Sequence, residues 1–155
     1  MLSEKKSELL RFLIKGSERE SMRIFNNMLA DYSITANQAE VLMILSQVGP
    51  LSLKEIGQLL ICEKGSPSRL IQSLVNKNLV SKTTNKIDQR KNVLTLTKKG
   101  EELIPKINEV NHQLNTLISN RINNEDTIDQ LITVFKNYLS GTETGKKIKL
   151  RYPNE

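Results

Sequence analysis

The sequence predicts a mainly α-helical fold with one small β-hairpin, on three observations. Apolar residues recur at spacings of three and four along most of the 155 residues, which is typical of amphipathic helices. Only residues 79–83 and 93–97 alternate between apolar and polar side chains, as half-buried strands do. Aromatic residues make up 4% of the chain and Trp is absent, so the core must be built mostly from Leu, Ile, Val and Met.

The first two helices are bounded by capping residues and helix breakers. Residues 4–29 keep the helical spacing throughout, with a point of weakness at Gly16-Ser17. Thr35 can cap a second helix, because Gln38 three residues later completes a capping-box pattern. Gly49-Pro50 is expected to stop that helix.

A short third helix and a fourth helix lead into the hairpin. Ser52 is the expected N-cap of the third helix, with Glu55 as its capping-box partner. The fourth helix should end near Asn78, a residue that can take the left-handed conformation usually given to glycine. The two strands follow, joined by a polar turn over residues 84–92.

Two further helices follow the hairpin. Thr97 is the expected N-cap of a helix that runs to about residue 122, with Pro105 near its start as a possible bend. Asn123 or Asn124 caps the last helix, which Gly141 ends. Residues 141–155 are polar and are predicted to form a basic, mobile tail.

Positive charge is concentrated in the middle third of the chain. The net charge is +6, but residues 51–100 alone carry ten basic and three acidic groups, or +7. Residues 1–50 are neutral and residues 101–140 carry −3. A basic region between neutral or acidic ends indicates a polyanionic partner, although a solvated lysine surface would give the same count.

Several function classes lack support in the sequence. No run of eighteen apolar residues predicts a membrane span, and the N-terminal apolar stretch is too short and too charged for a secretory signal. The single Cys62 cannot form an internal disulfide, which fits a reducing cytoplasm. His112 has no second ligand at a useful spacing, and no phosphate-binding loop or catalytic arrangement is present. We therefore expect a cytoplasmic protein that is not an enzyme, with no cofactor and no metal.

Helix, turn, helix and hairpin in this order form a winged helix-turn-helix. The stretch LSLKEIGQLLICEKGSPSRLIQSLVNKNLVSKTTNKIDQRKNVLTLTKKG resembles the MarR family of bacterial transcription regulators. The resemblance is carried most specifically by Asp88-Gln89-Arg90, the strand Leu94-Thr95-Leu96-Thr97 and the helix start at Lys99-Gly100, and it covers roughly residues 5–140.

The resemblance implies a homodimer with four segments in each chain. Residues 1–34 would form a dimerisation helix, 35–100 a winged helix-turn-helix lobe, 101–140 the C-terminal dimerisation helices, and 141–155 the tail. It also implies a regulator, usually a repressor, that binds double-stranded DNA at a pseudo-palindromic operator and is released by a small aromatic or anionic effector. The alternatives are a winged-helix module whose basic face binds an acidic protein, and a regulator that senses oxidants through Cys62.

The family pattern places DNA contacts on the fourth helix. Its early residues would meet base edges in the major groove, and the guanidinium of Arg69 could pair with guanine or phosphate. Pro67 fits best if Ser66 is the N-cap, whereas the family pattern begins the helix nearer Glu63. The candidates on and beside this helix are Lys54, Lys64, Ser66, Pro67, Ser68, Arg69 and Gln72. For Lys54 and Gln72 a solvated surface position is the alternative.

The hairpin turn supplies the remaining candidates. Arg90 is the expected tip residue for the minor groove, where negative potential attracts a guanidinium. Asp88 is expected to pair with an arginine and fix the shape of the turn, while Lys86 and Lys91 would contact phosphates. The alternative is a flexible, lysine-rich turn. For Cys62, packing as a small apolar residue is the alternative to redox sensing.

Overall fold

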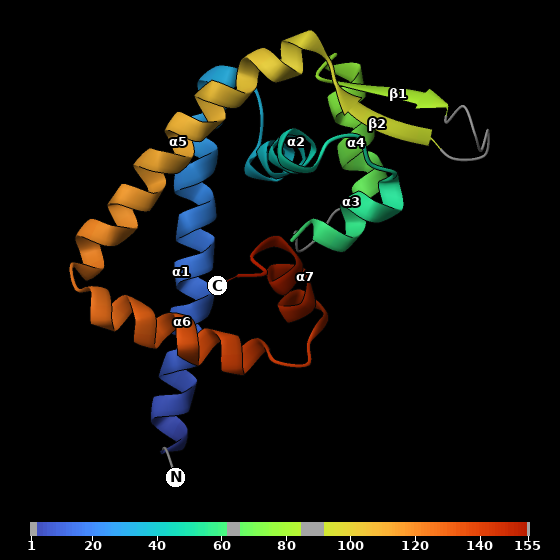
Figure 1. Cartoon of the computed structure of the whole chain (residues 1–155). Coiled ribbons are helices and arrows are strands. Elements are labelled where there is room, and N and C mark those ends of the chain that lie inside the picture. The colour runs from blue at the N-terminus through green and yellow to red at the C-terminus, as the bar shows by residue number, and fades with distance from the viewer. Residues whose placement is uncertain (1–2, 62–65, 85–91, 155) are drawn as a thin grey trace. The chain divides into compact units, whose positions relative to one another are not determined.

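The computed structural model describes residues 3–61, 66–84 and 92–154. These residues divide into two compact units, residues 1–36 and residues 37–155. The elements in chain order are α1 (Glu4–Leu29), η1 (Ala30–Tyr32), α2 (Ala36–Val48), α3 (Leu53–Leu59), α4 (Pro67–Asn76), β1 (Val80–Thr84), β2 (Asn92–Leu96), α5 (Lys98–Ile122), α6 (Glu125–Leu139) and α7 (Glu143–Arg151) (Figure 1). The predicted fold class, helical with one β-hairpin, is confirmed.

The first unit is a single long helix followed by a short turn. Ser3 caps α1, because its side chain accepts a hydrogen bond from the backbone N–H of Lys6. The helix runs through Gly16-Ser17 without a break, so the expected weakness there does not divide it. Four large apolar side chains on its N-terminal half are exposed: Leu9, Leu10, Phe12 and Leu13.

In the second unit, the end of α2 and the start of α3 lie where the sequence predicts them. Helix α2 ends before Gly49, whose φ of +95° favours glycine. Ser52 and Glu55 form the predicted capping box at α3, with the backbone N–H of Ser52 donating to Glu55 Oε2 at 2.7 Å. Buried apolar residues of this unit come from α2, α3 and its end, α4, the hairpin and α5: Val41, Leu42, Ile44, Leu45, Ile56, Leu60, Ile71, Leu74, Val80, Leu94, Leu103, Ile107 and Val110.

The hairpin is anchored on both edges of β2. Strands β1 and β2 pair antiparallel, with Val80 opposite Leu96 and Thr84 opposite Asn92. On the other edge of β2, Leu94 exchanges two backbone hydrogen bonds with Leu51, at 2.8 and 3.1 Å. The side chain of Leu94 is buried, and that of Leu96 is half-buried. The hairpin is therefore tied to the segment that precedes α3.

The start of α5 packs closely against the turn between α4 and β1. Asn78 has a φ of +58°, the left-handed conformation predicted for it. Thr97 caps α5 by accepting from the backbone N–H of Gly100, and its hydroxyl donates to the carbonyl oxygen of Asn78 at 2.7 Å. A Cβ on Gly100 would lie 2.2 Å from the carbonyl oxygen of Leu79, so only glycine fits at this position.

The predicted mobile tail is wrong for residues 143–151, which form α7. Gly141 turns the chain with a φ of +77°, and Thr142 then caps the helix by accepting from the backbone N–H of Gly145 at 3.0 Å. Basic residues in its last turn, Lys149 and Arg151, favour a helix C-terminus. This cap has a glycine where a capping box would have Glu or Gln, so the local pattern of polar residues does not predict a helix here.

Within residues 3–61, 66–84 and 92–154, no helix is both long and apolar enough to cross a bilayer.

Candidate nucleic-acid interface

Helix α4 presents a polar N-terminal end to solvent. Ser66 is its N-cap and Pro67 its first residue, so the helix begins at the position that suits proline. The carbonyl oxygen of Ser66 accepts from the backbone N–H of Arg69 at 2.9 Å. The hydroxyl of Ser66 hydrogen-bonds to the hydroxyl of Ser68 and makes no capping bond to the helix backbone. Two hydroxyls and one guanidinium therefore lie together at the start of this helix.

The exposed and buried sides of α4 are clearly separated. Ile71 and Leu74 are buried, whereas Arg69 and Gln72 are exposed along with the N-terminal serines. Gln72 Nε2 donates to Asn76 Oδ1 at 2.9 Å, four residues further along the same face. Since the groups that can donate or accept hydrogen bonds face outward, this side of α4 can offer them to a ligand.

Buried polar contacts fix the orientation of α4. Gln38 of α2 is only 6% exposed, and its Nε2 donates to Ser73 Oγ of α4 at 2.8 Å. At the other end of the helix, Lys77 Nζ donates to Gln38 Oε1 at 3.1 Å, and Lys99 Nζ of α5 donates to the carbonyl oxygen of Lys77. A buried amide with such partners has one favoured arrangement, so these contacts hold α4 on its lobe.

Ser73 and Lys77 are not among the residues predicted from the sequence, and the pattern of Gln38 predicts only a capping role. A usable signal was present, because Gln38 lies three and four residues before buried Val41 and Leu42 and so belongs to the apolar stripe of α2. A polar residue at such a position needs a buried partner. The identity of that partner depends on how α2 and α4 pack, which no local pattern encodes.

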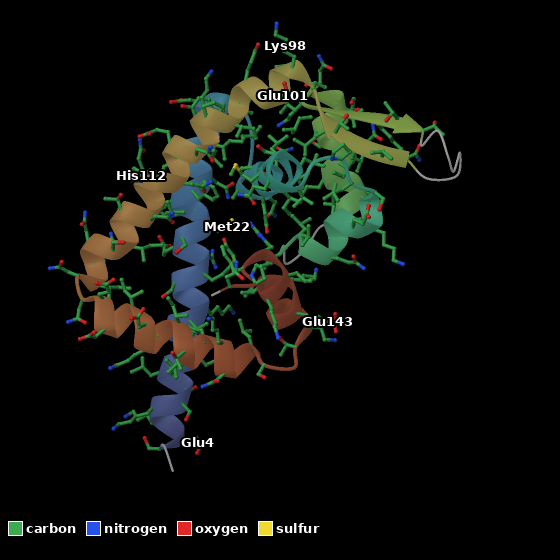
Figure 2. All side chains as sticks on the ribbon, viewed as in Figure 1. Glu4, Met22, Lys98, Glu101, His112 and Glu143 are labelled. Atoms are coloured by element: carbon green, nitrogen blue, oxygen red, sulfur yellow. The ribbon has the colours of Figure 1, made fainter. Side chains whose placement is uncertain are left out.

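Several basic side chains are exposed around α4. Lys54 lies in the first turn of α3 and Lys82 on β1. Lys98 lies in the first turn of α5 (Figure 2). Gly57 of α3 lies next to the start of α4, since a Cβ at this position would be 4.0 Å from the Pro67 side chain, an ordinary van der Waals distance. The exposed candidates Lys54, Ser66, Ser68, Arg69 and Gln72 thus come from two helices that contact each other.

The other candidates lie outside the described residues: Cys62, Lys64, Lys86, Asp88, Arg90 and Lys91. Their roles remain predictions from the sequence. His112 is exposed midway along α5 (Figure 2). Within residues 3–61, 66–84 and 92–154, no group of three or more His, Cys, Asp or Glu side chains could hold a metal ion.

Comparison with known proteins gives a consistent result. A family model described as transcriptional regulator SarA/Rot matches residues 23–107, more than half of the chain. The HTH-type transcriptional regulator SarZ of Staphylococcus aureus (strain MRSA252) is 28% identical over 104 residues, which span 67% of this chain and 70% of SarZ.

Solved structures share the fold at lower identity. A mutant of MarR from E. coli complexed with operator DNA is similar with a TM-score of 0.76 and 24% identity, over 84% of this chain and 93% of that one. A structure described as the mechanism for regulation of DNA binding of Bordetella bronchiseptica BpsR by 6-hydroxynicotinic acid has a TM-score of 0.75 and 20% identity, over 84% and 92% of the two chains. The winged helix-turn-helix predicted from the sequence is confirmed by these similarities.

Proposed function

This chain belongs to the SarA/Rot family of transcriptional regulators and is a DNA-binding protein of the MarR type, and we propose that it represses transcription as a homodimer on a pseudo-palindromic operator. The family membership rests on the match to residues 23–107. Two features of the same chain support homodimeric operator binding. The start of α4 is polar and exposed, and the apolar residues of α6 are not covered within the single chain.

The uncovered apolar residues of α6 support the dimer. This helix has fifteen residues, none of them buried. Five of its large apolar side chains are 39–71% exposed: Leu131, Ile132, Val134, Phe135 and Tyr138. Ile118 of α5 is exposed as well, and so are the four large apolar residues of α1. Water-exposed apolar groups in such number favour a partner surface, and in a two-fold dimer the same surface serves both chains.

The polar end of α4 supports recognition of the major groove. Ser66, Ser68 and Arg69 would meet base edges, because the N-terminal residues of a recognition helix are those that enter the groove. Lys54 and Gln72 would contact phosphates on either side, which fixes the register without reading sequence. In the hairpin turn we assign Arg90 to the minor groove, Lys86 and Lys91 to phosphates, and Asp88 to holding the turn.

A two-fold dimer would place two α4 helices on one face of the duplex. The operator should then contain half-sites about one helical turn apart, or roughly 10 base pairs. With +7 in residues 51–100, binding should weaken steeply as salt rises, because each phosphate contact releases counterions. Occupation of a promoter by such a dimer would exclude the polymerase, which is the proposed route to repression.

Release by a small molecule is a further part of the proposal. It is motivated by BpsR, whose DNA binding is described as regulated by 6-hydroxynicotinic acid. We propose a small aromatic or anionic effector for this chain, and 6-hydroxynicotinic acid is the first probe. A rival form of regulation is oxidation of Cys62. If Cys62 is a packing residue, peroxide should leave the DNA affinity of the wild-type protein unchanged. If Cys62 is a sensor, peroxide should lower the DNA affinity of the wild-type protein but not that of Cys62→Ser.

The test is a comparison of specific and random DNA by fluorescence anisotropy. Duplexes from the region upstream of its own gene would be titrated beside shuffled duplexes of equal length, over a series of salt concentrations. The proposal predicts tighter binding to a promoter duplex, by a factor that grows as salt suppresses non-specific contacts. Equal affinity for all duplexes at every salt concentration would rule out operator-specific regulation.

A further inference from the structure

Helix α7 contacts α3 and lies beside it (Figure 1). Polar side chains of α7 and α2 meet backbone groups just after the end of α3. Glu40 of α2 is at the centre of these contacts, because its Oε1 accepts from the backbone N–H of Ile61 at 3.0 Å and from Arg151 Nη1 at 2.5 Å. The side chains of Arg151 and Glu40 are 20% and 16% exposed, so water screens this pair only in part. Lys147 Nζ of α7 donates to the carbonyl oxygen of Leu60 at 2.9 Å.

These contacts converge on the C-terminal end of α3. Leu60 is the C-cap of that helix, and Ile61 follows it on the way to α4. The last carbonyl groups of a helix lack partners within the helix, and a cation stabilises them. Lys147 supplies that cation, while Glu40 satisfies the next backbone N–H. Two consecutive residues between the helices of the helix-turn-helix are therefore held by side chains from α2 and α7.

The charge on Glu40 depends on these partners. Burial raises the pKa of its carboxyl, and the hydrogen bond from Ile61 and the charge of Arg151 oppose that rise. Without Arg151, the cost of burying the Glu40 carboxylate would be offset less. Removing Arg151 would therefore disfavour the present packing of α2, α3 and α7. The network is thus sensitive to each of its members.

The position of α7 itself is fixed from its other end. A Cβ on Gly145 would lie 2.2 Å from the carbonyl oxygen of Leu139, so the first turn of α7 packs directly on the end of α6. Thr142 closes this junction, since its hydroxyl donates to the same carbonyl oxygen at 2.7 Å. Helix α7 therefore joins the end of α6, where the dimer surface is proposed, to the end of α3.

We propose that α7 is a brace for DNA binding, in which Lys147 and Arg151 are positioning residues that hold the α3–α4 junction through Leu60, Ile61 and Glu40. The inference rests on the proposed use of α4 as the recognition helix. No contact between α7 and DNA is required. Because the brace begins at the end of α6, it also gives a route by which a change at the dimer surface would alter the recognition helix.

The test compares three variants for affinity to an operator duplex. Arg151→Ala removes the bond to Glu40, and Lys149→Ala is the matched control, because it removes one exposed positive charge from the same helix. Glu40→Gln removes a negative charge and weakens the same network. The brace predicts about tenfold weaker operator binding for Arg151→Ala and for Glu40→Gln, and a change below about threefold for Lys149→Ala.

Simple electrostatics makes the opposite prediction for one variant. If α7 acts only through charge, Glu40→Gln should bind DNA more tightly, and the two basic-to-alanine changes should weaken binding equally. Either result would overturn the brace. Arg151→Lys should restore part of the affinity, because its ammonium can still donate to Glu40. Binding to random duplexes distinguishes the brace from a general loss of folding. If the brace is correct, Arg151→Ala should weaken binding to random duplexes less than binding to the operator.

Hydrogen exchange in the DNA-free protein keeps the test independent of the operator. The brace predicts faster exchange at the Ile61 amide in Arg151→Ala, and in Lys147→Met, than in wild type and Lys149→Ala, while the amides of α4 keep their protection. Unchanged exchange at Ile61 would overturn the brace even if the operator proposal holds. If exchange at Ile61 is faster in these variants but the wild-type protein binds promoter and random duplexes equally, the proposed function is rejected. The role of α7 in holding Leu60 and Ile61 is then still supported.

Discussion

The dimer surface on α6 gives the prediction whose size follows most directly from the structure. Phe135 is 39% exposed in the single chain. A fully buried aromatic side chain covers roughly 200 Å², so about 80 Å² of Phe135 remains to be buried by a partner. Two-fold symmetry doubles this to about 160 Å² per dimer. At about 25 cal/mol per Å², Phe135→Ala should weaken dimerisation by about 4 kcal/mol, an upper value because alanine keeps its Cβ.

The corresponding assay is sedimentation velocity over a range of protein concentrations. A loss of about 4 kcal/mol raises the dimer dissociation constant by nearly three orders of magnitude. The control is Asn137→Ala, a change of one exposed polar residue on the opposite side of the same helix, which should leave the dissociation constant unchanged. Circular dichroism should show equal helicity in both variants. If Phe135→Ala dimerises as tightly as wild type, α6 is not the interface.

Five single variants give further expectations that can be measured. Arg69→Ala should cost about 1–3 kcal/mol of operator binding, with the fold intact by circular dichroism. Arg90→Ala should cost a similar amount in anisotropy titrations, whereas tighter binding by Asp88→Ala would contradict the idea that this carboxylate shapes the hairpin turn. Gly100→Ala should lower the midpoint of urea unfolding substantially, because its Cβ would lie 2.2 Å from a backbone oxygen. Burial raises the pKa of Glu40 above its ordinary 4.5, so the folded state binds this proton more readily, and stability should fall as pH rises above 4.5 and then level off. Urea unfolding of Glu40→Gln should lack that part of the fall.

Local chemistry was enough to predict most of the helix boundaries. Ser52 with Glu55, Thr97, and the left-handed Asn78 each act within a few residues, so their roles follow from the sequence. The buried side of β2 follows in the same way, because alternation places Leu94 inward. The sequence left open whether α4 begins at Pro67 or nearer Glu63. In the structure it begins at Pro67, the position in a helix where proline is tolerated best.

Long-range contacts could not be predicted in this way. The hydrogen bond from Gln38 to Ser73 joins residues that are 35 positions apart, and the ion pair of Arg151 with Glu40 joins residues 111 apart. Such partners are set by the packing of whole helices and leave no local pattern. Helix α7 was missed for a related reason, because its docking on α3 and α6 stabilises a short segment with few apolar residues.

Selection of duplexes from a random DNA pool tests the central claim most directly, since it assumes no target gene. The wild-type protein would be mixed with the pool near physiological salt, and bound duplexes would be recovered and sequenced over several rounds. A homodimer that reads DNA through two α4 helices predicts an enriched inverted repeat, with half-sites about 10 base pairs apart. Duplexes bearing it should bind at least about 10³-fold more tightly than unselected duplexes. A pool that shows no enriched motif, or one without two-fold symmetry, would contradict the account.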